Sequence, residues 1–139
     1  MKLFKTIGVC IAFLCVSTHV VAQENTQHDS LQIKQVINNT FLAMETGDSV
    51  LLASCFSKDA TLQVQGSKND SVFVSIVPAK DFIARITKSP KGTLHERVVE
   101  WKHILIDNNI ASVWIPYTFH RGEAYSHRGI DVFQMVRLS

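Results

Sequence analysis

The last third of the chain alternates apolar and polar residues with a period of two. This period is typical of strands with one face toward a core. The breaks between the runs fall at turn-forming residues, 107–109 and Gly122. Three long strands are predicted, over residues 95–106, 110–120 and 124–137. Because short turns join consecutive strands in antiparallel fashion, this part of the chain predicts an antiparallel sheet.

Helical spacing dominates the residues before these strands. Ser30 is the predicted cap of a first helix over residues 31–45, in which apolar residues recur every three or four positions. Gly47 ends this helix, Asp48 caps a second short helix, and Pro78 begins a third. Two short hairpin strands are predicted between the second and third helices, over residues 60–65 and 72–77. Helices that precede a run of strands predict an α+β fold, with the helices packed on one face of a curved antiparallel sheet.

The first 22 residues resemble a secretory signal peptide. Lys2 and Lys5 precede an uncharged apolar run that ends at Ala22 with small residues and is followed by a polar stretch. An uncleaved membrane anchor is the alternative, although the run of about 17 residues is at the short limit for a span. We expect cleavage after Ala22, export to the periplasm or the exterior, a domain formed by residues 23–139, and no membrane contact after cleavage.

Removal of this segment changes the charge and the cysteine content. The net charge of +2 is carried by Lys2 and Lys5, so the remaining chain is balanced, which argues against a nucleic-acid-binding protein. Cys55 would be the remaining cysteine, so a core rather than an internal disulfide must hold the domain together. The histidines lack the close spacing of metal ligands, and we expect neither a metal nor another cofactor.

Three short motifs accompany this order of elements. They are Thr-Gly-Asp at residues 46–48, Phe-Ser-Lys-Asp-Ala-Thr at 56–61 and Ser-His-Arg-Gly-Ile-Asp-Val-Phe at 126–133. Together they resemble the nuclear transport factor 2-like superfamily, which includes ketosteroid isomerases, SnoaL-like polyketide cyclases and exported bacterial proteins described as lumazine-binding. The resemblance implies a cone of three helices on a curved sheet, with a cavity lined by the last strands.

The resemblance argues against ketosteroid isomerase activity. When residues 47–48 and 59–61 are aligned with those enzymes, the tyrosine of the oxyanion hole falls on Thr40 and the general base on Val64. Asp131 alone matches a functional position, the protonated aspartate of the oxyanion hole. Because neither threonine nor valine can perform the missing roles, this reaction is not expected.

The last strand supplies the candidate site. Residues two apart share a strand face, which predicts one face made of Tyr125, His127, Asp131, Phe133 and Met135. His127 and Asp131 are roughly 13 Å apart along a strand, too far for a direct hydrogen bond. From the preceding strand we expect the set with Tyr117, Phe119 and Ile115 to share this face, although a one-residue slip would bring in Trp114, Thr118 and His120.

Two functions from different classes follow from this face. The first is a non-catalytic exported domain with an apolar cavity for a small apolar or aromatic molecule. Its predicted ligand-binding residues are Tyr117, His127, Asp131, Phe133 and Met135. The second is a SnoaL-like cyclase or isomerase in which His127 and Asp131 perform acid–base chemistry, because His127 has a suitable ordinary pKa. A polar network with only a structural role, or a dimerisation module with a collapsed cavity, is the remaining alternative.

The resemblance also draws attention to the end of the sequence. Members of the superfamily continue past the strand that corresponds to residues 124–137 into one more strand, which has no counterpart before Ser139. Either the reading frame is truncated, or this is a shorter variant whose sheet lacks its final strand. A free sheet edge pairs readily with another chain, which predicts a homodimer formed through the sheet.

Overall fold

The computed structural model describes residues 17–138 and, within the first helix, side chains from Thr26 onward. The cleavage of residues 1–22 stays a prediction, because residues 1–16 lie outside the described residues. Helices and strands follow the order α1 (Ser17–Thr46), α2 (Ser49–Ser54), β1 (Thr61–Lys68), β2 (Ser71–Pro78), α3 (Ala79–Ile86), β3 (Leu94–Val98), β4 (His103–Asp107), β5 (Ile110–Arg121) and β6 (Ala124–Val136).

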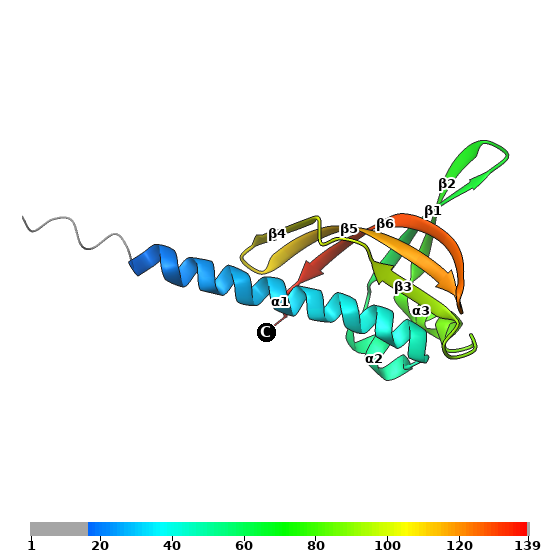
Figure 1. The fold of residues 1–139 in the computed structure, drawn as a ribbon, viewed down its shortest axis with the longest axis horizontal. Helices are drawn as coiled ribbons and strands as arrows, with labels where there is room; N and C mark the ends of the chain where they lie inside the picture. Colours follow the sequence, from blue (N-terminus) through cyan, green and yellow to red (C-terminus); the bar gives the residue numbers. More distant parts are fainter. Residues whose placement is uncertain (1–16, 139) are drawn as a thin grey trace, which may run out of the picture.

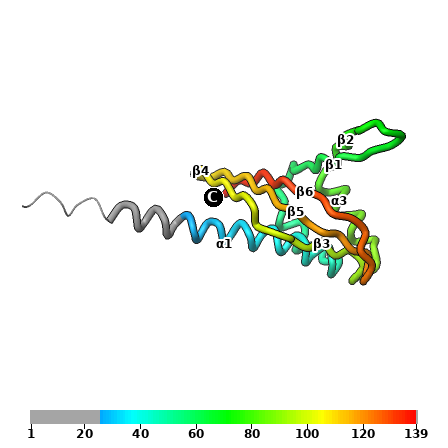
Figure 2. Tube along the Cα trace, turned by 45° about the horizontal axis from the view of Figure 1, so that its top comes forward, coloured from blue at the N-terminus to red at the C-terminus, as the bar shows by residue number. Residues whose placement is uncertain are grey.

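The architecture is α+β, as predicted from the sequence. β5 is the central strand of a curved antiparallel sheet, with β3 and β4 along one side and β6 along the other. α1 runs along one face of this sheet (Figure 1). The short helices α2 and α3 lie near the C-terminal end of α1. β1 and β2 form a separate hairpin that projects from the domain in both views (Figures 1 and 2). The sheet is therefore open rather than closed into a continuous cone.

Two element boundaries differ from those predicted. α1 begins at Ser17, so Ser30 lies inside the helix and does not cap it. The residues from Ser17 to Ser30 include neither proline nor glycine, so no strong helix breaker interrupts the helix upstream of Ser30.

The strand predicted over residues 95–106 is two strands, β3 and β4. β3 pairs with β5 at residues 117–121, whereas β4 pairs with it at residues 110–114. Pro116 lies between these two segments and has no N–H to donate to the ladder. Its carbonyl still accepts a hydrogen bond from the Val99 N–H at 2.9 Å, so the chain crosses the break close to β5.

The turn from α1 to α2 follows the prediction. Gly47 has φ +67°, a left-handed conformation that glycine adopts without the strain of a Cβ atom. The Asp48 side chain accepts hydrogen bonds from the N–H groups of Val50 and Leu51 at 3.0 and 2.9 Å. This cap satisfies two donors that α2 leaves unpaired at its first turn.

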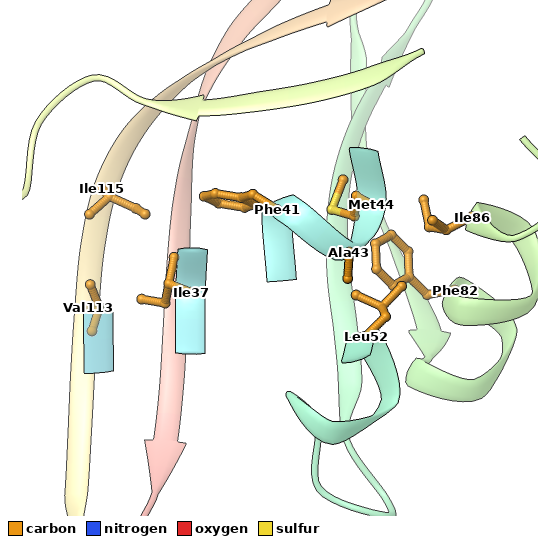
Figure 3. Close-up of a cluster of buried hydrophobic side chains, with 9 residues drawn as sticks. All are labelled: Ile37, Phe41, Ala43, Met44, Leu52, Phe82, Ile86, Val113 and Ile115. Atoms are coloured by element: carbon orange, nitrogen blue, oxygen red, sulfur yellow. The ribbon is translucent and has the colours of Figure 1, made fainter. Parts of the chain in front are cut away.

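The core lies between α1, the sheet and the two short helices. Ile37 and Phe41 of α1 face Val113 and Ile115 of β5, and all four are buried (Figure 3). The rest of the buried cluster joins α1 to α2 and α3 and consists of Ala43, Met44, Leu52, Phe82 and Ile86. One apolar stripe of α1 therefore anchors the sheet and both short helices. No helix within residues 17–138 is long and apolar enough to cross a membrane.

Candidate functional site

The face of β5 and β6 that is turned toward the helices carries the candidate site. Val113 and Ile115 of β5 are buried on this face, and the alternation of a strand puts Tyr117 and Phe119 on the same side. In the register of the pair, Tyr117 lies opposite Gly129 and Phe119 lies opposite His127. The set that contains Tyr117 is therefore the one that shares a face with His127.

Glu96 of β3 joins this face from the other side of β5. It lies opposite Phe119 in the ladder and makes a side-chain hydrogen bond with Asp131 of β6. Burial raises the pKa of Glu96 to about 9, and the neighbouring Asp131 carboxyl adds to the shift. At neutral pH the Glu96 carboxyl is therefore protonated and donates to Asp131.

Asp131 plays the complementary role in this pair. Burial raises its pKa, while the hydrogen bond from Glu96 opposes that rise because it stabilises the carboxylate. Ile115 lies opposite Asp131 in the ladder and is fully buried, which explains the poor solvation on that side. Since both pKa values are raised, the two carboxyl groups hold a proton between them more readily than exposed carboxyl groups do, with Asp131 accepting the hydrogen bond from Glu96.

Tyr117 is positioned by the absence of a side chain at Gly129. A Cβ atom at Gly129 would lie 2.5 Å from the Tyr117 hydroxyl oxygen and 2.6 Å from its Cζ atom. The phenol therefore lies directly over the backbone of β6. Burial raises the pKa of Tyr117, and Glu96 and Asp131 contribute to the rise. The phenol therefore remains a neutral hydrogen-bonding group next to the carboxyl pair.

His127 is the exposed member of the group. Its Nε2 atom is 3.4 Å from the Tyr117 hydroxyl, and its Nδ1 atom is 3.1 Å from the Ser126 hydroxyl. The imidazole ring also contacts the rings of Tyr117 and Phe119, with centroid distances of 5.9 and 5.1 Å. Since solvent reaches this imidazole, a ligand could reach it as well.

We call Glu96, Tyr117, His127 and Asp131 the polar cluster. It combines two hydrogen-bonded carboxyl groups, a phenol and an imidazole beside the ring of Phe119. Such a group can donate and accept hydrogen bonds with a polar ligand atom, and it contains both partners needed for proton transfer.

Three other predicted residues lie outside this cluster. Phe133 packs its ring against that of Phe41 at 6.2 Å, and Met135 lines a small pocket of about 190 Å³ farther along the sheet. Tyr125 pairs with His120 across a bulge between β5 and β6, with the two rings 5.7 Å apart. The expectation that Tyr125 shares the face of His127 is therefore wrong, because the bulge changes the alternation at this end of β6.

Glu96 is the site residue that sequence reasoning missed. It is an acidic residue between Leu94 and Val98, at a position where alternation puts all three on one strand face. An acidic residue in such a position is a signal of a buried carboxyl group. Its pairing with Asp131 of β6 could not be read from the pattern, because β5 separates the two strands.

A larger pocket of about 590 Å³ lies at the opposite end of the sheet, between α1 and the turn at Asn108. Asp29 and Arg137 form an ion pair at this pocket. The hydrogen bond and charge of Arg137 lower the pKa of Asp29. Among the side chains that the structure describes, from Thr26 onward, no three histidine, cysteine, aspartate or glutamate side chains are grouped closely enough to hold a metal ion.

Comparison with known proteins gives structural matches only. No family model and no curated protein matches the sequence. A solved structure from Shewanella baltica OS155, described as an NTF2-like protein of unknown function, matches with a TM-score of 0.58 and 17% identity, over 80% of this chain and 83% of the other. A second NTF2-like protein of unknown function, from Silicibacter pomeroyi DSS-3, has a TM-score of 0.49 and 13% identity, over 78% and 98% of the two chains. The helix order, the curved antiparallel sheet and the first of these matches together show that the chain has the nuclear transport factor 2-like fold.

Proposed function

We propose that the protein binds a small apolar or aromatic molecule on the helix-facing side of the sheet, against the polar cluster, and that it does so without catalysis. The observation that carries this proposal is the Glu96–Asp131 carboxyl pair, which lies beside Tyr117 and the exposed His127. Apolar rings with a few converging polar groups are the usual composition of small-molecule sites. Phe119 and Tyr117 supply the rings, and the cluster supplies the polar groups.

The energetic cost of the carboxyl pair supports a functional role. A carboxyl group whose pKa is raised by burial opposes folding at neutral pH, because the unfolded chain would ionise it. A neutral side chain of the same shape would avoid this cost. Side chains with strongly shifted pKa values are concentrated at functional sites, because function there requires an ionisable group in spite of its cost to folding.

An enzyme is the second candidate, and the shared proton favours it. Glu96 as acid and Asp131 as base have opposite roles at one place, which is the arrangement needed to move a proton to and from a carbonyl substrate. In this version, the protein acts as a SnoaL-like cyclase or isomerase, with His127 and Asp131 in acid–base roles and Glu96 added to them.

The proposal extends to the location of the protein. The signal-like segment of residues 1–22 supports export, so the ligand would be met in the periplasm or outside the cell. Sequencing the N-terminus of the protein recovered from the exported fraction tests this directly. A first residue at Gln23 is expected, whereas an intact Met1 would contradict cleavage.

Native mass spectrometry of the protein purified from its source tests the binding proposal. We expect a bound small molecule on the unchanged protein and its loss from the Asp131→Asn variant, with circular dichroism unchanged. Glu123→Gln is the matched control, because it removes a carboxylate from the exposed β5–β6 turn and should keep the ligand. If Asp131→Asn unfolds the domain and no molecule is ever found, the cluster has a structural role only.

A carbonyl compound recovered in chemically altered form after incubation with the protein would favour the enzyme instead. Loss of that conversion in Glu96→Gln, with binding retained, would identify Glu96 as the acid.

A further inference from the structure

The end of the sheet away from the polar cluster holds one continuous pocket. Its larger part, of about 590 Å³, and its smaller part, of about 190 Å³, share five of the residues that line them. Small-molecule sites in proteins usually measure roughly 300–1,000 Å³, so this space is sufficient for a small ligand. The shared residues are Asp29, Gln32, Ile106, Asn108 and Arg137, and we call the combined space the end pocket.

The smaller part of the end pocket has an apolar floor. Ile106 of β4, Ala111 of β5 and Met135 of β6 lie directly opposite one another in the ladder and form this floor. Ile33 and Val36 of α1 line the same space. An apolar cavity of about 150 Å³ can hold a benzene molecule. A space of about 190 Å³ is therefore large enough for a branched aliphatic or aromatic side chain.

The small side chain of Ala111 accounts for this space. In the adjacent row of the sheet, Val113 occupies the central position, between Ile104 and Phe133. Val113 is fully buried, and Ile37 of α1 packs against it (Figure 3). In the row that forms the floor of the end pocket, the central side chain is a single methyl group, so α1 and the sheet do not fill the space between them.

The larger part of the end pocket carries one ion pair. Asp29 of α1 and Arg137 form this pair, and half of the Arg137 side chain is exposed. The Arg137 N–H donates to the Asn109 carbonyl at 2.8 Å, which holds the residue beside the β4–β5 turn. An ion pair this open to solvent contributes little to stability, so a ligand can separate the two charged groups at little cost.

We propose that the end pocket binds a free α-amino acid with an apolar side chain. The Arg137 guanidinium donates hydrogen bonds to the carboxylate, whose planar geometry it matches, and Asp29 accepts hydrogen bonds from the ammonium group. The apolar side chain occupies the smaller part of the pocket, over Ala111. A zwitterion replaces the ion pair with two new pairs, whereas a fatty acid or an amine would leave one protein charge without a partner.

The end pocket is separate from the polar cluster. Met135 and Asp131 are four residues apart on β6, which is roughly 13 Å along a strand. Phe133 lies between them on the same face and packs its ring against that of Phe41, with the centroids 6.2 Å apart. A layer of aromatic side chains therefore separates the two sites. Binding of an amino acid at the end pocket does not depend on the function proposed for the cluster.

Equilibrium dialysis of the purified protein against radiolabelled L-leucine or L-phenylalanine tests the proposal. We expect the protein to retain both amino acids at millimolar concentration. Analogues that lack one recognised group should compete at least about tenfold less well. These analogues are 4-methylpentanoate without the ammonium group, 3-methylbutylamine without the carboxylate, and glycine without the side chain. The proposal is overturned if neither amino acid is retained, or if 4-methylpentanoate competes as well as unlabelled leucine.

Two variants test whether the amino acid binds at the end pocket. Ala111→Leu fills the apolar part and keeps both charged groups, whereas Arg137→Gln removes the cation. Each should weaken leucine binding by about tenfold or more, with an unchanged circular dichroism spectrum. Arg137→Gln decides the question alone if Ala111→Leu does not fold.

The matched control is Arg128→Gln, because Arg128 is an exposed arginine on the opposite face of β6 and its loss should leave leucine binding unchanged. Asp131→Asn, which alters the polar cluster, should also retain leucine. The proposal is overturned if Arg137→Gln binds leucine as the unchanged protein does. Loss of leucine from Asp131→Asn would overturn it as well, since the amino acid would then bind at the polar cluster.

Discussion

Replacing Glu96 with glutamine removes an ionisable group from the carboxyl pair while keeping its shape. The pKa of Glu96 is raised from 4.5 to about 9 in the folded protein, chiefly by burial. The folded state therefore holds a proton that the unfolded chain releases above pH 4.5. It follows that the contribution of Glu96 to stability is most favourable below pH 4.5 and declines as the pH rises toward 9.

The size of the effect follows from the shift. Each pKa unit corresponds to about 1.36 kcal/mol. Between the unfolded value of 4.5 and pH 7, the unfolded chain gains about 3 kcal/mol from ionising Glu96, as an upper value. Glutamine does not ionise, and its amide can still donate to Asp131. Glu96→Gln should therefore raise the free energy of unfolding by up to about 3 kcal/mol at pH 7 and by less than about 1 kcal/mol at pH 5.

Urea denaturation of both proteins at pH 5, 6, 7 and 8 measures this difference. Glu123→Gln serves as the control, because this carboxylate lies in the exposed β5–β6 turn. The reasoning would be refuted if the curves of Glu96→Gln and the unchanged protein stayed parallel across this pH range. A loss of stability in Glu96→Gln at all pH values would show instead that the pair stabilises the fold as a hydrogen-bonded unit.

Four further substitutions test other parts of the structure by chemical denaturation. Gly129→Ala should cost about 1–3 kcal/mol, because its Cβ atom would overlap the Tyr117 hydroxyl; an unchanged stability would mean that the ring moves freely. Asp48→Ala should cost about 1 kcal/mol through loss of the α2 cap, whereas Asp48→Asn should cost much less. Leu52→Ala removes a fully buried side chain and should cost about 2–5 kcal/mol, and a loss below 1 kcal/mol would show that the core collapses around it.

Local chemistry explains which parts of the fold were predictable. Gly47 and Asp48 determine their turn through a left-handed backbone and a side-chain cap, and both effects depend on neighbours in sequence. The period-two pattern likewise identified β5 and β6, because one face of each strand must meet the core. The break between β3 and β4 was also within reach, since Pro116 in the middle of β5 removes a donor.

Contacts across several strands could not be predicted in this way. The bulge that removes Tyr125 from the face of His127 depends on how β5 and β6 fit together around their turn. The hydrogen bond between Glu96 and Asp131 spans two strands that are not neighbours, so it depends on the curvature of the whole sheet. The period-two pattern of a strand identifies the sheet face on which a side chain lies. The side chain that it contacts on that face depends on the strand register and on the curvature of the sheet.

The polar cluster lies on the helix-facing side of the open sheet, next to the buried Ile115. Burial is the largest cause of the raised Glu96 pKa, and the Asp131 carboxyl adds to it. Asp131→Asn removes the second contribution and leaves the first. The free energy of unfolding of Asp131→Asn, measured between pH 5 and 8, should therefore depend less steeply on pH than that of the unchanged protein. Identical pH dependence would show that burial alone raises the Glu96 pKa and that the two carboxyl groups do not act as a pair.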